Sequence, residues 1–146
     1  MSLQTLKVNG TGEKTKSTFQ VREHQIVIDE PENFGGANTG PNPMEYVLAS
    51  LAGCENVMLH MIAKEQGVEM GSVDFSVEGT LNTDGLEGMG GVRPYFQNIK
   101  VQAEISTDAS DEQIQSIRSE LEKRCPAYTM LKAASIEIDS EWTKSK

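Results

Sequence analysis

The sequence contains few cysteines and few basic residues. Only two of its 146 residues are cysteine, and this number excludes a disulfide-dense secreted scaffold, while their separation of 71 positions matches no zinc-binding spacing. Thirteen Lys and Arg residues oppose 22 Asp and Glu residues, so the formal net charge is -9. Such a charge repels phosphate backbones and anionic lipid headgroups. We therefore expect neither nucleic acid nor a membrane surface as a partner.

Long apolar segments are also missing. The longest mostly apolar run without a charged residue, Tyr46 to Cys54, is about half the length needed to cross a bilayer. The first residues, Met1 to Gln4, do not combine a basic segment with an apolar one, so no secretory signal is predicted. From these observations we expect a cytoplasmic protein without a transmembrane helix. No residue pattern predicts a metal or a cofactor.

The composition is that of an ordinary globular domain. Hydrophobic residues make up 37% of the chain and charged residues 24%, and 146 residues are enough to bury a single core. No internal repeat, low-complexity tract or linker divides the chain. We therefore expect one domain over residues 1–146.

Alternating apolar residues predict two groups of strands. We expect the first group to form an N-terminal antiparallel meander, with its strands at Leu3 to Val8, Ser17 to Arg22 and Gln25 to Asp29. The second group is predicted at Ser72 to Leu81, Phe96 to Ile105 and Ser135 to Trp142. A segment with five glycines, Asn82 to Pro94, is interpreted as a flexible hairpin connection.

Two helices have well-marked beginnings. Asn42, Pro43 and Glu45 fit the N-cap, first position and capping-box acid of a helix that we expect to end near Gln66, before Gly67. This helix lacks a charged face around Cys54, which is typical of a central buried helix. Ser110 and Gln113 repeat the capping box, and Pro126 must interrupt that second helix directly after Cys125.

Both cysteines lie on apolar helix faces, and two interpretations remain open. They are inert core residues, or they form a working thiol pair. A reactive thiol needs a cation, a helix N-terminus or a base beside it. The basic candidates are Arg22, Arg93 and Arg124. His60 lies about 120° around the helix from Cys54, so we expect no Cys-His dyad within that helix.

Two glutamates lie near Cys54 in the sequence. Glu45 precedes it by nine residues, about 14 Å along a straight helix and on the opposite side, so it cannot serve its own Cys54 directly. A kinked helix or a second subunit could bring such a carboxylate to a thiol. Glu55 is closer, but its charge would raise the pKa of a neighbouring thiol.

Three segments together resemble the OsmC/Ohr family. They are Asp29-Glu30-Pro31, the run from Gly40 to Cys54 that contains Asn-Pro-Met-Glu and Ala-Gly-Cys, and Cys125-Pro126 before a closing strand. The likeness spans nearly the whole chain in order. It implies an α+β fold of intertwined homodimers, with an N-terminal β-meander, a central buried helix, and a second sheet and helix.

The resemblance also implies a function for the thiols. In this family the first cysteine attacks an organic hydroperoxide and the second resolves the sulfenic acid into a disulfide, which by position assigns these roles to Cys54 and Cys125. An arginine from the N-terminal strands and a glutamate near the start of the helix activate the thiolate, which points to Arg22 and Glu45. The implied partners are a second copy of the chain, a small organic hydroperoxide and a dihydrolipoyl-type dithiol reductant.

The sequence departs from the family pattern at the glutamate. In hydroperoxide-reducing members the glutamate directly follows Asn-Pro, whereas here Met44 does, and Glu45 comes one place later. This shift turns the carboxylate by about 100° around the helix. The chain is therefore more similar to the less characterised OsmC-like branch.

Two functional hypotheses follow. The first is a cysteine-based peroxidase that reduces organic hydroperoxides in oxidative-stress defence, through a Cys54 sulfenate and a Cys54-Cys125 disulfide. The second is a non-catalytic dimer that binds an apolar ligand or senses oxidants through its thiols. Four methionines would suit an apolar pocket in the second case: Met44, Met58, Met61 and Met70.

Overall fold

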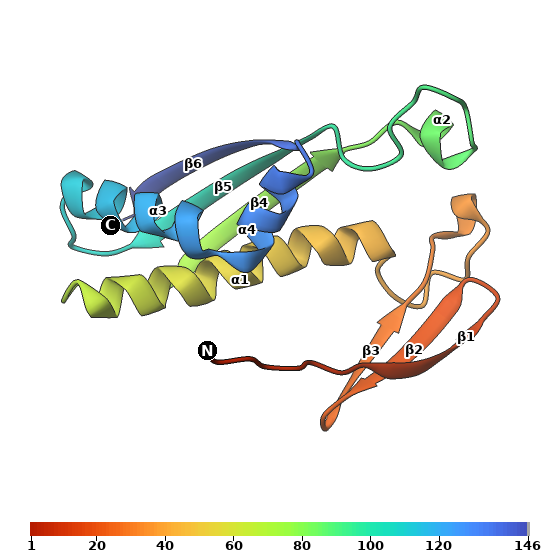
Figure 1. The fold of residues 1–146 in the computed structure, drawn as a ribbon, viewed down its shortest axis with the longest axis horizontal. Coiled ribbons are helices and arrows are strands. Elements are labelled where there is room, and N and C mark those ends of the chain that lie inside the picture. Colours follow the sequence, from red (N-terminus) through yellow and green to blue (C-terminus); the bar gives the residue numbers. More distant parts are fainter. Residues whose placement is uncertain (146) are drawn as a thin grey trace. The chain divides into compact units, whose positions relative to one another are not determined.

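The computed structural model describes residues 1–145, and these divide into two compact units. The first unit is Met1–Val47 and the second begins at Leu48, so the boundary falls within the first turns of a long helix, α1 (Pro43–Glu65). Figure 1 shows the elements of both units. Each unit has its own three-stranded sheet, and the fold is a mixed α+β one, as the sequence predicts.

The first unit contains the predicted antiparallel meander, in the order β1-β2-β3. Its strands are β1 (Asn9–Glu13), β2 (Lys16–Val21) and β3 (His24–Ile28), and a short 3₁₀ helix, η1 (Glu32–Phe34), follows them. The prediction of a strand at Leu3 to Val8 is wrong, because the first strand begins at Asn9 and contains Gly10 and Gly12. Gly10 pairs with Phe19, whose ring lies so close that a Cβ on residue 10 would collide with it.

A buried carboxylate organises the loop after β3. Asp29 accepts hydrogen bonds from the Thr39 hydroxyl at 2.6 Å and backbone N–H at 3.1 Å, and from the Thr15 hydroxyl and the Glu30 N–H, both at 2.8 Å. These bonds, led by the one from the Thr39 hydroxyl, hold the pKa of Asp29 well below its usual range. They join three segments of the first unit at one residue.

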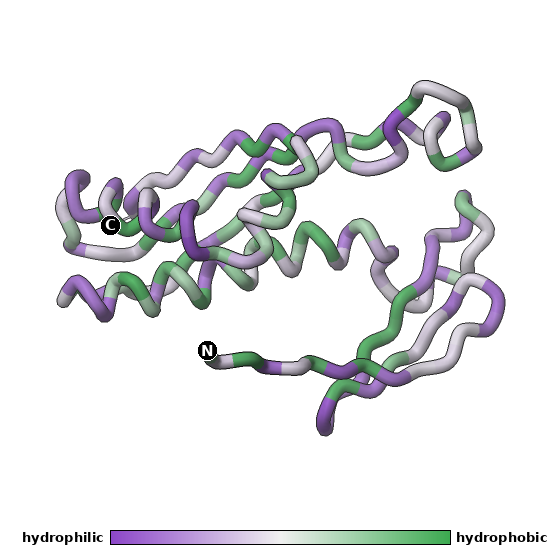
Figure 2. The backbone as a smooth tube through the Cα atoms, in the orientation of Figure 1, coloured by the Kyte–Doolittle hydropathy of each residue, from purple (hydrophilic) through white to green (hydrophobic). Residues whose placement is uncertain are grey.

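Helix α1 begins as the sequence predicts. The Asn42 side chain accepts from the Glu45 N–H, and the Glu45 carboxylate accepts from the Asn42 N–H, each at 2.8 Å, which completes the capping box. The helix ends before Gly67, whose φ of 72° lies in the left-handed region that favours glycine. Figure 2 shows hydrophobic segments recurring along this helix.

By length and composition, α1 is long enough and apolar enough to cross a membrane. The charge-free run Tyr46 to Cys54 underestimates the length of the apolar segment. The helix has 23 residues, and from Tyr46 to Ala63 its only charged residue is Glu55. A core helix of a soluble protein meets the same criteria. Three residues of α1 are indeed fully buried within the second unit: Leu51, Leu59 and Ile62.

The second unit contains a sheet in the order β4-β5-β6, with helices on one face. Its strands are β4 (Val73–Thr80), β5 (Asn98–Ser106) and β6 (Glu137–Ser145), and the connection between β4 and β5 includes a four-residue helix, α2 (Thr83–Leu86), that the glycine-rich sequence did not predict. β4 and β5 are antiparallel, whereas β5 and β6 are parallel. A parallel pair requires a crossover, which is made by α3 (Asp111–Arg124) and α4 (Pro126–Ala133).

The core of the second unit lies between this sheet and the helices α1 and α3. Strand residues of one parity face the core, whereas their neighbours, among them Asp74, Lys100 and Glu141, face outward and are exposed. The buried cluster contains Met58, Leu59, Ile62, Ala63, Ile105, Ala109, Ile114, Ile117, Leu121 and Cys125. Cys54 packs against the same cluster.

Candidate functional site

The two cysteines meet in the second unit. Cys54 comes from the middle of α1 and Cys125 from the junction of α3 and α4, and their sulfurs are 3.2 Å apart. Both are free thiols. Because a disulfide requires a separation of about 2.05 Å, the sulfurs need to approach by only about 1 Å to bond. The residues that the sequence left as either core fillers or a thiol pair are therefore a pair embedded in the core.

The position of Cys125 follows from the proline after it. The Cys125 N–H still donates to Leu121 O at 2.8 Å, but Pro126 begins a new helix, so Cys125 has an extended backbone and serves as the N-cap of α4. The Cys125 sulfur makes no capping hydrogen bond to α4 and faces Cys54 instead. The kink thus directs this side chain across to α1.

The two thiols differ in exposure and in acidity. Cys125 is completely buried, whereas Cys54 is partly exposed. Burial raises the pKa of the Cys125 thiol to about 12, its contact with Cys54 adds to the rise, and the backbone N–H groups of Tyr128 and Ala127 oppose it. Cys125 therefore keeps its proton at neutral pH and donates it to the Cys54 sulfur.

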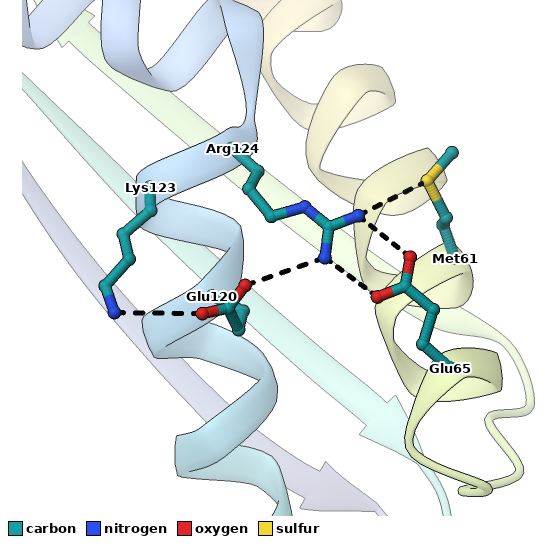
Figure 3. A network of polar contacts seen from close by, with 5 residues as sticks. All are labelled: Met61, Glu65, Glu120, Lys123 and Arg124. Atoms are coloured by element: carbon teal, nitrogen blue, oxygen red, sulfur yellow. Dashed lines mark hydrogen bonds and ion pairs between the residues drawn. The ribbon is translucent and has the colours of Figure 1, made fainter.

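An ion-pair network fixes the end of α3 just before Cys125 (Figure 3). The Arg124 guanidinium binds both carboxylate oxygens of Glu65 on α1, at 2.8 and 2.9 Å, and it also lies 3.6 Å from Glu120 and 3.9 Å from the Met61 sulfur. These carboxylates raise the pKa of Arg124, and the hydrogen bond with Arg124 lowers that of Glu65. Arg124, a candidate for activating a thiol, is therefore bound to carboxylates and joins α1 to α3.

The second basic candidate, Arg93, is also bound by other groups. Its guanidinium donates to the backbone carbonyls of Phe96 and Gln97 at 3.0 Å and of Ser135 at 3.3 Å, and it lies 4.8 Å from the centre of the Tyr95 ring. These bonds connect the segment before β5 to the turn before β6. Arg93 thus has a structural role in the second unit.

The predicted activating residues, Arg22 and Glu45, belong to the first unit. Arg22 lies in the turn between β2 and β3 with a φ of 53°, and its exposed side chain pairs with Glu23 at 3.8 Å. The Glu45 carboxylate forms the capping box of α1. Their action on Cys54 stays a prediction.

Glu55 is a buried acid on α1, and its burial was not predicted from the sequence. It is 1% exposed, and its Oε2 atom has no hydrogen-bond partner among residues 1–145. Burial raises the pKa of Glu55 to about 7, the Glu122 carboxylate adds to the rise, and Arg118 opposes it. Its spacing of four from Leu51 and from Leu59, both buried, is the sequence signal that places it on the core side of α1.

His60 is the remaining titratable residue of α1 near the thiols in sequence. Its two ring nitrogens lie 2.9 Å from Asn56 O and 3.1 Å from Gly71 O. These contacts connect α1 to the segment before β4, so the expectation that His60 forms no dyad with Cys54 agrees with its hydrogen bonds. Within the described part of the chain, no group of three or more His, Cys, Asp or Glu residues is placed to hold a metal ion.

A comparison with family models decides the family. Residues 35–141, which include both cysteines, match the model described as OsmC-like protein. The chain belongs to the OsmC-like family. A hydroperoxide reductase of Mycoplasma pneumoniae is 27% identical to this OsmC-like protein over 113 residues, which are 77% of this chain and 76% of that protein.

Solved structures agree on the fold. An OsmC-like protein from Mycoplasma pneumoniae matches 98% of this chain and 99% of its own, with a TM-score of 0.82 and 23% identity. An organic hydroperoxide resistance protein from Elizabethkingia anophelis matches 99% of each chain, with a TM-score of 0.77 and 16% identity. The predicted OsmC/Ohr-like fold is confirmed.

Proposed function

We propose that this OsmC-like protein is a cysteine-based peroxidase that reduces organic hydroperoxides in oxidative-stress defence. The observation that carries the proposal is the 3.2 Å contact between a partly exposed sulfur, Cys54, and a buried, protonated one, Cys125. The names of its relatives, a hydroperoxide reductase and an organic hydroperoxide resistance protein, support the same substrate class.

Cys54 is the peroxidatic residue in this proposal because it is the more exposed thiol and accepts the S–H hydrogen bond from Cys125. A donor at this distance stabilises negative charge on the Cys54 sulfur. The thiolate attacks one peroxide oxygen, an S–O bond forms and the O–O bond breaks. The leaving alkoxide takes a proton and departs as an alcohol, which leaves a sulfenic acid on Cys54.

Cys125 is the resolving residue. Its sulfur attacks the Cys54 sulfur, an S–S bond forms, the S–O bond breaks, and hydroxide leaves with the thiol proton as water. A dithiol reductant, which we propose to be of the dihydrolipoyl type, then returns two electrons and reopens the disulfide. The cycle therefore needs no metal or organic cofactor.

The surroundings of the pair favour apolar substrates. Buried aliphatic side chains form the core around both sulfurs, and Val57 and Met61, one and two turns after Cys54 on α1, are exposed. Alkyl and lipid hydroperoxides therefore fit better than hydrogen peroxide. We also propose that Arg22 and Glu45 activate Cys54, that the protein acts as a homodimer, and that it is cytoplasmic.

The alternative of an apolar ligand held among methionines has less support. Of the four methionines considered, Met58 belongs to the buried core cluster and Met70 packs against it. Met61 contacts the Arg124 guanidinium. These three residues therefore have structural partners within the second unit.

Thiol counting tests the proposed function. One equivalent of cumene hydroperoxide should remove both titratable thiols of each chain, because oxidation of Cys54 and closure of the disulfide consume two. Cys54→Ser should leave the single remaining thiol unreacted. Cys125→Ser should lose one thiol and accumulate a sulfenic acid that dimedone traps.

The same measurement identifies failure. Two thiols that still titrate after treatment, in a protein whose circular dichroism is unchanged, would contradict peroxidase chemistry. Ser50→Ala, a change on an exposed serine one turn before Cys54, is the matched control and should react as the unmodified protein does.

A further inference from the structure

A partly buried polar cluster adjoins the thiol pair, and the proposed peroxidase cycle does not use it. We define the Glu55 cluster as Glu55 of α1, Arg118 and Glu122 of α3, and Tyr128 of α4. The Tyr128 hydroxyl donates to Glu122 Oε2 at 3.2 Å, and Arg118 Nε lies 3.9 Å from the same oxygen. Glu55 is the most buried member, and its Oε2 atom lacks a partner in the described structure.

The cluster contains one cation and two carboxyl groups. Arg118 compensates the charge of Glu122 and also donates to Ser140 O on β6 at 2.7 Å. If Glu55 is protonated the cluster is neutral, whereas an ionised Glu55 adds an uncompensated charge on a side chain that is 1% exposed. The proton on Glu55 is therefore bound with a pKa near 7.

The sheet packed against this part of α1 adds no charged group near Glu55. The core-facing residues of the sheet are uncharged: Val73, Phe75 and Val77 on β4, Ile99, Val101, Ala103 and Ile105 on β5, and Ile138, Ser140 and Trp142 on β6. Glu122 and Arg118 of α3 act electrostatically on Glu55, and Glu55 acts on Tyr128 of α4, whose pKa is raised to about 12 mainly by burial. Glu55 is thus the member that titrates near neutral pH.

The cluster connects to both sulfurs. Glu55 directly follows Cys54 on α1, so the carboxyl and the sulfur share one turn of helix. Tyr128 connects to the other sulfur, because its backbone N–H faces Cys125 while its hydroxyl binds Glu122. A negative charge on the thiol pair and a negative charge on Glu55 therefore repel each other. Each charge disfavours ionisation of the other group to the same extent.

We propose that Glu55 binds a proton while the reduced Cys54–Cys125 pair carries a negative charge and releases it when the pair closes into a neutral disulfide. The proposal rests on the proposed function only in treating the two thiols as one redox couple. A dithiol reductant supplies two electrons and two protons when the S–S bond breaks. One proton stays on Cys125, and when Cys54 carries the negative charge of the pair the Glu55 carboxylate takes the other proton.

Infrared spectroscopy of the full chain tests this coupling directly. The C=O band of protonated Glu55 is followed from pH 5.5 to 8.5 in protein reduced by dithiothreitol and in protein oxidised by diamide, and Glu55→Gln assigns the band. We expect the band to persist to a pH about one unit higher in the reduced protein, a tenfold difference in proton affinity. Equal midpoints in the two states would overturn the proposal.

Alkylation kinetics give a second, independent measurement. In a Cys125→Ser background, Glu55→Gln should increase the rate of Cys54 alkylation by iodoacetamide about three- to tenfold at pH 8 and leave it unchanged at pH 5.5, where Glu55 is already neutral. Glu55→Asp should keep the original pH dependence. Glu69→Gln, on an exposed residue of the same unit, is the control for net charge and should change neither rate.

These outcomes are distinguishable from failure of the peroxidase proposal. Diamide closes a thiol pair whether or not the protein reacts with hydroperoxides, so a chain that is inert to cumene hydroperoxide still reports on Glu55. If Glu55→Gln does not fold, the shifted band of Glu55→Asp assigns the signal instead. A pH-independent rate ratio between Glu55→Gln and its parent would show a structural effect and contradict the coupling.

Discussion

At the scale of single residues, Glu55 stands out because it is an ionisable residue at a buried position. It occupies a core position of α1 where neighbouring turns carry Leu51 and Leu59, so a carboxyl replaces an aliphatic side chain. Burial of such a group disfavours its charged form. The ionisation of Glu55 therefore lowers the free energy of unfolding by an amount that depends on pH.

The direction of this effect predicts a pH-dependent stability. The Glu55 pKa rises from 4.5 to about 7 on folding, so between these pH values the folded state holds a proton that the unfolded state has lost. The free energy of unfolding should therefore fall as pH rises from 4.5 through 7, by at most about 3 kcal/mol. Urea unfolding at pH 5 and pH 8 measures this decrease.

Glu55→Gln provides the comparison. Its amide does not titrate, so the difference in stability between pH 5 and pH 8 should shrink by about 2 to 3 kcal/mol relative to the unmodified chain. An unchanged difference would show that Glu55 is not the titrating group. Glu69→Gln should retain the full decrease.

How much of the site the sequence predicts depends on how each residue is positioned. The motifs around Cys54 and Cys125 identified the thiol pair through a family resemblance, whereas spacing alone favoured inert core cysteines. Arg124 could not be assigned, because its partner Glu65 lies 59 positions away and only the packing of α1 against α3 brings them together. The role of Glu55 depends on the same packing.

At the scale of elements, local chemistry fixed the helix ends. Both capping boxes use residues three positions apart, so the sequence identifies them without knowledge of the fold. The strands were harder, because β1 is exposed throughout and its pairing, not its composition, makes it a strand. The parallel pairing of β5 with β6 joins segments that no local signal relates.

Removal of the α3 cap should weaken the second unit measurably. The Ser110 hydroxyl accepts from the Gln113 N–H at 3.1 Å, so Ser110→Ala should lower the free energy of unfolding by about 1 kcal/mol. Ser116→Ala, in the exposed middle of the same helix, should be neutral or slightly stabilising because alanine favours helix. Urea unfolding of both variants tests this, and equal losses would contradict a capping role.

At the scale of the whole molecule, both cysteines lie within the second unit, and their disulfide would close a long segment of it. Restricting the unfolded chain in this way should stabilise the oxidised form by up to about 4 kcal/mol for a loop of roughly 70 residues. Urea unfolding of diamide-oxidised and reduced protein measures the difference. Hydrogen exchange should show the added protection in β4 to β6 and little change in β1 to β3, and equal protection in both units would contradict the restriction.

The position of Cys125 inside the crossover between β5 and β6 has a consequence for biosynthesis. Translation adds about 5 to 20 residues per second, so Cys54 exists for roughly 4 to 14 seconds before its partner is made. During that interval the nascent chain carries Cys54 without the second thiol that contacts it in the folded protein. Every newly made copy thus passes through a brief period in which Cys54 can meet an oxidant before Cys125 has left the ribosome.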